Sequence, residues 1–310
     1  MSSGIQTWSS NGKLLITGEY LVMEGALSFA LPLKVGQSLS VSKNNSKILR
    51  WNAIGPNGAW FTAGYELSLF KILSTDNTNL AHKLRDILTT VRKMSSSFLM
   101  DKLGFDVVTN LDFDSEYGFG TSSTLISNIA MWADVNPYKL LEQTFGGSGY
   151  DIACAQSDSP ILYQREGDTI RVTNLNFNPT FTKNIYFVYL GNKQNSSDSI
   201  ASFKKQGKFN SSDISRITDI TNELIKTNEL QNFQNLLDEH EVILSKILGL
   251  PTVKSLYFSD FSGTVKSLGA WGGDFVLVTT SETEENLRTY MNAKGYNIIF
   301  SYDELVLSNQ

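Results

Sequence analysis

A glycine-spaced run of hydroxyl residues opens an apolar helix in the first half of this 310-residue chain. Residues 116–124 read Glu-Tyr-Gly-Phe-Gly-Thr-Ser-Ser-Thr and continue into an apolar run that begins at Leu125. Gly118 and Gly120 allow a tight turn and a close approach of the backbone to a ligand. The helix start offers unpaired N–H groups and the positive end of its dipole, which suit a phosphate. This segment therefore predicts an anion site, and the competing interpretation is an ordinary Ser/Thr helix cap.

Two further segments place a charged residue beside glycines. Residues 147–151 read Gly-Ser-Gly-Tyr-Asp and precede a short apolar helix, so Asp151 by itself would be a helix cap or first-turn acid. In residues 10–20, Lys13 begins an apolar strand that ends in Gly-Glu-Tyr. Lys13 by itself would be a surface charge at a strand end. The order of the three segments along the chain is more specific than any one of them.

In this order the three segments resemble the motifs of the GHMP kinase family (galactokinase, homoserine kinase, mevalonate kinase, phosphomevalonate kinase). Residues 11–25 resemble the first family motif, P-G-K-x-x-L-x-G-E-Y/H-x-V-x-x-G. Residues 114–123 resemble the second, P-x-x-x-G-L-G-S-S-A, and residues 148–151 match the family's Ser-Gly-x-Asp. Residues 269–274, Gly-Ala-Trp-Gly-Gly-Asp, approximate the third motif, G-A-G-G-G-G. The resemblance covers nearly the whole chain.

The chain departs from these motifs at four positions. Asn11 and Asp114 stand where prolines are usual, which alters the stiffness of the loops. Trp271 and Asp274 stand where glycines are usual. A bulky ring and an acid in that loop put the inherited binding geometry in doubt. Asp274 would either repel a phosphate or simply begin the strand that follows.

The resemblance implies an α+β fold of two domains. The N-terminal domain would be an α/β domain like ribosomal protein S5, at residues 1–168, and the C-terminal domain, at 169–310, a ferredoxin-like antiparallel sheet with helices. Hydrophobic periodicity along the chain agrees with this architecture. Strands are predicted at 13–17, 38–42, 48–54, 60–62, 105–111, 160–163, 170–172, 185–190, 275–279 and 298–300. Helices are predicted at 80–91, 122–134, from 137, from 151, and at 196–205, 213–226, 230–248 and 282–294.

The resemblance also implies ATP and Mg²⁺ as cofactors of a phosphoryl transfer, which needs positioning and charge neutralisation rather than covalent catalysis. Ser122 and Glu142 would be the metal ligands, since Mg²⁺ takes few protein oxygens beside phosphate oxygens. For Glu142 the alternative is a solvated helix acid. The ATP phosphates would lie against Gly118, Phe119, Gly120, Thr121, Ser122 and Ser123.

By the same resemblance, Asp151 would accept the proton of the acceptor hydroxyl or orient that oxygen for attack. Lys13 would lie beside Asp151, keep it ionised and stabilise the transferring group. For Tyr20 the alternative to substrate contact is simple packing. The residues predicted on the substrate side are Glu19, Tyr20, Gly147, Ser148, Gly272 and Gly273.

The Gly-Glu-Tyr and Gly-Ser-Gly-Tyr-Asp segments resemble phosphomevalonate kinases, although the chain lacks an obvious basic cluster for a substrate phosphate. We therefore expect a kinase acting on mevalonate or phosphomevalonate, that is, an alcohol or a phosphate-monoester acceptor. One rival is the decarboxylase that shares this fold and uses ATP on diphosphomevalonate. The other is a non-catalytic homologue that binds a ligand, which the altered loop 269–274 suggests.

The composition limits the remaining possibilities. The net charge of −5 and the lack of a long basic run disfavour nucleic acid as a partner. The single cysteine, Cys154, excludes an internal disulfide framework and is expected to be buried. The start of the chain does not read as a signal peptide and no segment reads as membrane-spanning, so we expect a cytoplasmic monomer or homodimer. His82 is expected in solvent, and residues 192–198 are expected to form a mobile loop.

Overall fold

The computed structural model describes residues 4–100, 103–191, 203, 205 and 208–308, and it has a mixed α/β fold. The chain divides into two compact units, each built from several segments. Unit 1 consists of Met1–Gly12, Val35–Ser115 and Phe119–Gln156. Unit 2 consists of Lys13–Lys34, Glu116–Gly118 and Ser157–Gln310. Among the described residues, no helix is both long and apolar enough to cross a membrane.

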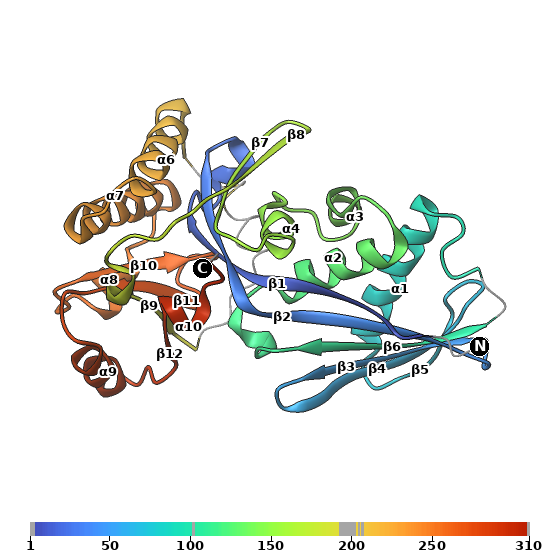
Figure 1. The fold of residues 1–310 in the computed structure, drawn as a ribbon. Helices are drawn as coiled ribbons and strands as arrows, with labels where there is room; N and C mark the ends of the chain where they lie inside the picture. The colour runs from blue at the N-terminus through green and yellow to red at the C-terminus, as the bar shows by residue number, and fades with distance from the viewer. Residues whose placement is uncertain (1–3, 101–102, 192–202, 204, 206–207, 309–310) are drawn as a thin grey trace. The chain divides into compact units, whose positions relative to one another are not determined.

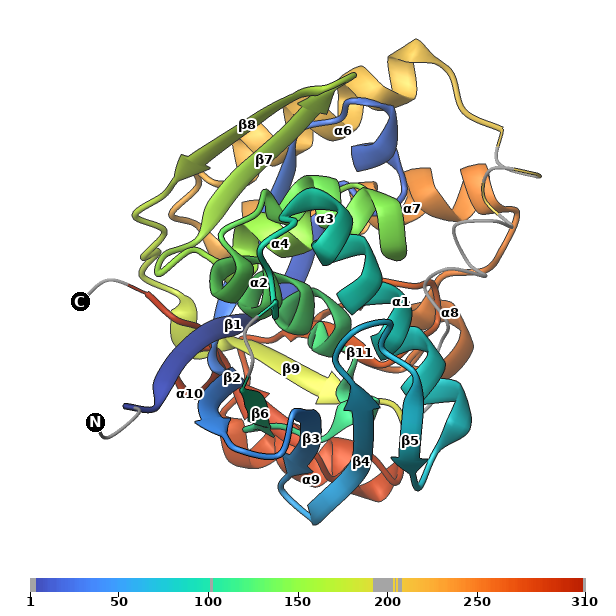
Figure 2. The ribbon, with the colours of Figure 1, turned by 90° about the vertical axis from the view of Figure 1, so that its right-hand side faces the viewer.

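Unit 1 is a sheet with helices on one face, as Figures 1 and 2 show for α1, α2 and α3. The strand neighbours are β5-β4-β3-β6-β2, with β1 paired to β2, and β3 and β6 run parallel. Along β3, Leu49, Trp51 and Ala53 are buried in the core while Arg50 is exposed, the alternation of a strand with one face covered. The strands are β1 (Gln6–Thr17), β2 (Ser28–Asn44), β3 (Ile48–Gly55), β4 (Gly58–Glu66), β5 (Ile72–Thr75) and β6 (Gly104–Leu111).

Helices α1 and α3 of unit 1 start at a side-chain cap, and α2 and α4 start after a glycine. The Asn77 side chain accepts a hydrogen bond from the amide of Leu80 at the start of α1, and Asn136 caps α3 just before Pro137. Helix α2 starts after Gly120, whose φ of 97° is readily adopted only by glycine. The helices are α1 (Thr78–Met94), α2 (Thr121–Ala133), α3 (Pro137–Thr144) and α4 (Tyr150–Ala155).

A buried polar network fixes α2 on the two long strands beneath it. The hydroxyl of Ser10 in β1 donates to Ser127 and to the amide oxygen of Asn128 in α2, both over 2.8 Å. The amide nitrogen of Asn128 donates to the carbonyl of Gln37 in β2, and the hydroxyl of Thr124 donates to the Gln37 side chain. Buried polar groups that are all paired in this way hold one specific packing arrangement. The network therefore fixes where α2 begins within unit 1.

Unit 2 contains an antiparallel sheet with the strand order β10-β11-β9-β12 and a hairpin of β7 and β8 that pairs with residues 28–30 of β2. One face of the four-stranded sheet packs against α8 and α9. Helix α7 also packs against β10. The strands are β7 (Ile161–Glu166), β8 (Thr169–Asn174), β9 (Ile185–Tyr189), β10 (Thr264–Leu268), β11 (Phe275–Thr279) and β12 (Ile299–Ser301).

The longer helices of unit 2 bury an apolar stripe. In α6, Ile217, Ile220 and Leu224 are buried, and Asn210 forms a capping box with Asp213 at its start. The N-cap of α6 is therefore Asn210. The helices are α6 (Ser211–Leu224), α7 (Leu230–Leu248), α8 (Val253–Tyr257), α9 (Glu284–Ala293) and α10 (Tyr302–Leu305); short 3-10 turns are η1 (Leu21–Glu24), η2 (Ser115–Tyr117) and η3 (Thr182–Asn184).

The predicted α+β class is confirmed, as are most of the predicted helices. Strand β1 is longer than predicted, so Lys13 lies inside the strand and not at its start. Strands β5 and β10 were not predicted. The predicted helix 196–205 lies almost entirely outside the described residues, and the predicted loop 192–198 lies outside them altogether. Residue 168, the predicted domain boundary, lies in the turn between β7 and β8, inside unit 2.

Candidate active site

The glycine-spaced hydroxyl cluster forms the turn that leads from η2 into α2. Gly118 and Gly120 both have positive φ, 66° and 97°, as the sequence predicts for a tight turn. The hydroxyl of Ser123 and the backbone amide of Thr124 donate to the carbonyl of Gly120 over 2.8 and 2.9 Å, so they stabilise the turn itself. Ser122, by contrast, is exposed. Of the predicted ligand residues at the helix start, Ser122 is exposed, Thr121 is half-buried and Ser123 is buried.

Phe119, the residue between the two glycines, anchors the turn. Its side chain is 1% exposed and packs edge-on against Phe113, with ring centroids 5.6 Å apart. A ligand at this turn would therefore meet the backbone of Phe119 and not its ring. Burying the ring positions the neighbouring N–H groups at the helix start, which is where an anion would bind.

Two of the sequence segments meet in unit 2 at Lys13 and Gly118. The ammonium group of Lys13, in β1, donates a hydrogen bond to the carbonyl oxygen of Gly118 over 2.9 Å. The two residues are 105 positions apart in the sequence, and Lys13 is only partly buried. The structure thus brings the predicted catalytic lysine to the first glycine of the predicted phosphate turn.

Asp274, one of the departures from the family motifs, also lies against Gly118. A methyl group on the α-carbon of Gly118 would overlap the carboxyl group of Asp274, so glycine is required here for close approach as well as for its positive φ. The carbonyl of Asp274 accepts from the amide of Leu190, which fixes the start of β11. Asp274 therefore both begins the strand and faces the glycine turn, and the two interpretations of this residue are compatible.

The predicted base, Asp151, lies in unit 1 in the first turn of α4. Gly149, with φ of 91°, precedes this helix, and the Asp151 carboxylate accepts from the amide of Ile152 over 3.1 Å. The pKa of the Tyr138 phenol, in α3, is raised by burial and then by the negative charge of Asp151. Lys13 and Asp151 belong to different units, and their pairing stays a prediction.

The remaining unit 1 residues of the predicted site lie close to these helices. Ser148 is buried and Gly147 has a positive φ of 109°, in the turn before α4. Glu142 is an exposed residue of α3, which packs against α2. Within residues 4–100, 103–191 and 208–308 there is no cluster of three or more His, Cys, Asp or Glu side chains that would hold a metal ion. Ser122 and Glu142, the predicted magnesium ligands, are both exposed, and their coordination of a metal ion stays a prediction.

Glu19, predicted on the substrate side, is 3% exposed and has a protein partner. Its carboxylate accepts a hydrogen bond of 2.5 Å from the ammonium group of Lys266, which is fully buried in β10. Lys266 also donates to the carbonyl of Ser267 over 2.8 Å. Burial raises the pKa of Glu19 to about 7 despite the charge of Lys266. Substrate contact by Glu19 stays a prediction, while the protein contact is a finding.

Two further residues of this buried cluster, His240 and Glu241, come from α7. Nε2 of His240 accepts a hydrogen bond from the amide of Gly18 over 2.9 Å, so this nitrogen carries no proton. The distance of 3.4 Å between Nε2 and the Glu19 carboxylate is therefore not a charged ion pair. Burial and the charge of Lys266 lower the pKa of His240 well below its usual value. The Glu241 carboxylate accepts from the amide and hydroxyl of Ser267, and burial raises its pKa.

Sequence reasoning missed this cluster because each member looks ordinary by itself. His240 and Glu241 fall in an amphipathic helix pattern, where they read as polar positions beside the apolar stripe. Lys266 interrupts a short apolar run, and for this reason the apolar pattern did not predict β10. The available signal was a lysine that follows Val265 and lies two positions before Leu268, just ahead of the third glycine segment. A lysine inside a buried strand needs an acidic partner.

Tyr20 meets the third glycine segment directly. Its hydroxyl oxygen accepts a hydrogen bond from the backbone N–H of Trp271 over 2.8 Å. Trp271 lies in the loop 269–274 that joins β10 and β11, together with Gly272 and Gly273. The indole N–H of Trp271 donates to the carbonyl of Pro251, 3.1 Å away. The segments that carry the predicted substrate-side residues Glu19, Tyr20, Gly272 and Gly273 are therefore connected within unit 2.

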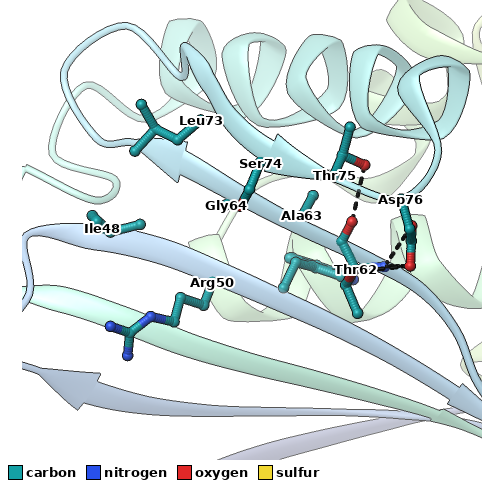
Figure 3. Close-up of a pocket in the computed structure, with 10 residues that line it drawn as sticks. Ile48, Arg50, Thr62, Ala63, Gly64, Leu73, Ser74, Thr75 and Asp76 are labelled. Carbon is teal, nitrogen blue, oxygen red and sulfur yellow. Dashed lines mark hydrogen bonds between the residues drawn. The ribbon is translucent and has the colours of Figure 1, made fainter.

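A groove lies elsewhere in unit 1 and contains none of the predicted site residues. It has a volume of about 500 Å³ and is formed by β3, β4 and β5 (Figure 3). Its polar groups are already satisfied, since both carboxylate oxygens of Asp76 accept from Thr62 and the Thr75 hydroxyl donates to the Thr62 carbonyl. This groove carries no chemistry that points to a ligand.

The comparisons with known proteins concern the fold. No family model and no curated protein sequence matches the chain. Among solved structures, the chain is similar to the mevalonate kinase of Methanococcus jannaschii, with a TM-score of 0.71, 15% identity and 99% of each chain covered. It is also similar to the phosphomevalonate kinase of Streptococcus pneumoniae in complex with phosphomevalonate and AMPPNP, with a TM-score of 0.70, 14% identity, and 96% and 99% of the two chains covered.

A third similar structure is a decarboxylase. The mevalonate diphosphate decarboxylase of Staphylococcus aureus has a TM-score of 0.61 and 9% identity, with 98% of this chain and 95% of that chain covered. Identities this low show a common fold and leave the reaction open. The near-complete coverage of each chain means that the similarity extends over both units. This chain has the two-domain fold of the GHMP kinases.

Proposed function

We propose that the protein is an ATP-dependent kinase that phosphorylates a small-molecule alcohol or phosphate monoester, with mevalonate or phosphomevalonate as the acceptor. The observation that carries this proposal is the hydrogen bond from Lys13 to the carbonyl of Gly118. A cation next to a glycine turn at a helix start is the arrangement that phosphoryl transfer requires, because the reaction depends on positioning and on neutralising phosphate charge.

In this proposal the turn at residues 118–123 binds the nucleotide phosphates through its backbone N–H groups. Lys13 orients Gly118 and adds positive charge near the transferring group. Asp151 orients the acceptor hydroxyl for attack and accepts its proton as the new bond to phosphorus forms. Bound Mg²⁺, held by the exposed side chains of Ser122 and Glu142, would neutralise charge on the phosphate oxygens.

Retention of Lys13, Ser122 and Asp151 favours an enzyme over a ligand-binding homologue, because binding alone does not require all three. The decarboxylase remains the second candidate, since a protein with that activity shares this fold. The two reactions differ in their products: both release ADP, and only the decarboxylase releases CO₂.

The test is release of ADP from Mg-ATP by the purified protein with mevalonate, phosphomevalonate, diphosphomevalonate, homoserine or galactose, with CO₂ followed in parallel. ADP formation with mevalonate or phosphomevalonate and no CO₂ would support the proposal. ADP with CO₂ would assign the decarboxylase reaction. Nucleotide binding without turnover on any acceptor would contradict the proposed substrates and favour a different alcohol or a binding role.

A further inference from the structure

The tripeptide 18–20 is bound to the C-terminal part of unit 2 through each of its residues in turn. Beyond the bond from Gly18 to α7, Glu19 pairs with Lys266 in β10, and Tyr20 accepts the amide hydrogen bond of Trp271 in the loop after β10. The last two partners are five positions apart. Glu19 thus fixes the strand, and Tyr20 fixes the loop that leaves it.

The backbone at Tyr20 is strained to make this contact. Its φ of 64° and ψ of −51° are rare for a residue with a side chain. Such a conformation persists only where neighbouring interactions hold it, and it recurs at functional sites. Here the preceding residue, Glu19, is anchored by a buried ion pair, and the amide of Val22 donates to the carbonyl of Gly18 over 2.8 Å. Interactions of the residues before and after Tyr20 therefore hold its backbone in this strained conformation.

Tyr20 binds the loop 269–274, and this loop ends at Asp274, which lies against Gly118 in the glycine turn 118–123. Trp271 packs against the apolar cluster that includes Tyr20 and Ile247, and three residues later Asp274 meets the α-carbon of Gly118. A shift of Trp271 would therefore move the segment that sets Asp274 against the turn. Gly118 in turn accepts the hydrogen bond of Lys13.

We propose that Tyr20 is a positioning residue, whose hydroxyl holds the loop 269–274 and thereby the place of Asp274 beside Gly118. The part of this proposal that concerns catalysis rests on the proposed kinase function. The part that concerns the loop is independent of it. Tyr20 would act through Trp271 and Asp274 and not by touching the transferring phosphoryl group.

The variant Tyr20→Phe separates the hydroxyl from the ring. The ring contact with Phe203, at 5.2 Å between centroids, is kept, and the acceptor for the Trp271 amide is lost. Tyr65→Phe is a matched control, because Tyr65 in unit 1 also loses one buried hydroxyl bond, of 2.9 Å to the carbonyl of Ala81. Any general effect of removing a buried hydroxyl appears in both variants.

The first measurement is amide hydrogen exchange of residues 269–274 without ligands. Tyr20→Phe should accelerate exchange at Trp271 by severalfold to about tenfold, the range expected for loss of one net hydrogen bond, and Tyr65→Phe should not. Unchanged exchange at Trp271 in Tyr20→Phe would overturn the proposal. This readout needs no substrate, so it decides on the loop even if the wild type phosphorylates none of the acceptors.

The second measurement is the kcat and KM of the wild type and both variants with the acceptor that the wild type uses. Positioning by Tyr20 predicts a kcat/KM about tenfold lower in Tyr20→Phe, at a thermal midpoint no lower than that of Tyr65→Phe. Faster exchange with an unchanged kcat/KM would show that the loop position does not matter for transfer and would overturn the catalytic part. Glu19→Gln is the second variant, and it should also accelerate exchange at Trp271, since it removes the ion pair that anchors Tyr20.

Discussion

The amide of Gly18 donates a hydrogen bond to Nε2 of His240 over 2.9 Å, which leaves the imidazole neutral inside a cluster that contains a lysine and two carboxyl groups. Nε2 has its lone pair engaged, so the ring proton resides on Nδ1. The charge balance of the cluster therefore depends on Glu19, Glu241 and Lys266. The stability of unit 2 therefore depends on pH, and the direction contributed by each group follows from the direction of its pKa shift.

Glu19→Gln should flatten that pH dependence. Because the pKa of Glu19 is raised from 4.5 to about 7 in the fold, the folded state holds a proton that the unfolded state releases between these values. Glu19 therefore lowers the free energy of unfolding as pH rises from 4.5 to 7, by at most about 1.4 kcal/mol per pH unit. The raised pKa of Glu241 acts in the same direction, and the lowered pKa of His240 removes stability as pH falls below 6.5.

The measurement is urea unfolding of the wild type and Glu19→Gln at pH 5, 6, 7 and 8. The variant should lose less stability than the wild type between pH 5 and 7, and the exposed substitution Glu285→Gln should reproduce the wild-type profile. Parallel profiles for the wild type and Glu19→Gln would contradict the assignment of this titration to Glu19.

Asp151→Asn should reduce turnover by about 10²–10⁴-fold, the usual contribution of a positioned general base. Asparagine keeps the size of the side chain and can still accept from the Ile152 amide, so the thermal midpoint should stay close to that of the wild type. The comparison is the steady-state kcat of Asp151→Asn with that of Asp158→Asn, an exposed neighbour. Full activity of Asp151→Asn would show that this carboxylate is not needed for transfer.

Lys13→Met should lower kcat by about 10²-fold or more, because it removes both a charge near the transferring group and the donor to Gly118. Lys13 is partly exposed, so the loss of stability should be small. Lys13→Arg keeps the charge with a different geometry and should retain intermediate activity. The exposed Lys93→Met serves as the control for removing a lysine. Equal activity of Lys13→Met and Lys93→Met would remove Lys13 from the mechanism.

Gly118→Ala should weaken nucleotide binding, and Asp274→Ala should partly rescue it. The added methyl group overlaps the carboxyl group of Asp274, and the loss of affinity caused by this overlap disappears in the double variant. The loss of affinity caused by the positive φ of 66° at this position remains. Calorimetric titration of the wild type, the two single variants and the double variant gives the coupling between the two positions. Strictly additive losses would show that Asp274 does not lie against Gly118 in solution.

Asn128→Ala should destabilise unit 1 by about 2 kcal/mol or more, since it leaves both the Gln37 carbonyl and the Ser10 hydroxyl short of a buried partner. Asn292→Ala replaces an exposed residue in a helix of unit 2 and should change the free energy of unfolding little. Chemical denaturation of the two variants gives the difference. A loss as small as that of Asn292→Ala would mean that the buried network does not hold α2 on β1 and β2.

The sequence was sufficient where a signal is local. The apolar spacing predicts residues 230–248 as a helix, and α7 has these bounds. Pro137 marks the start of α3, and the glycine pair 118 and 120 predicts the turn before α2. Each of these features depends on neighbours a few positions away, which are visible in a single stretch of sequence.

The sequence failed where an element depends on distant partners. Only residues 38–42 of β2 (Ser28–Asn44) were predicted, because Pro32 and Gly36 read as strand breakers. Both fall between the pairing of residues 28–30 with β7 and that of residues 37–44 with β6, so they interrupt neither of these two ladders. The partners of Gly18, Glu19 and Tyr20 are likewise set by the tertiary fold, and no local pattern identifies them.

The three bonds of the tripeptide 18–20 span 222, 247 and 251 residues of sequence. During synthesis, the N-terminal segment leaves the ribosome long before Lys266 and Trp271 have been made. Residues 18–20 must therefore stay without these partners, with Glu19 in water, until β10 and the loop after it have been made. Closing such distant contacts is slow and exposes apolar surface meanwhile. Truncation before β10 would consequently remove the partners of Glu19 and Tyr20, and such a fragment should bind chaperones or aggregate instead of folding.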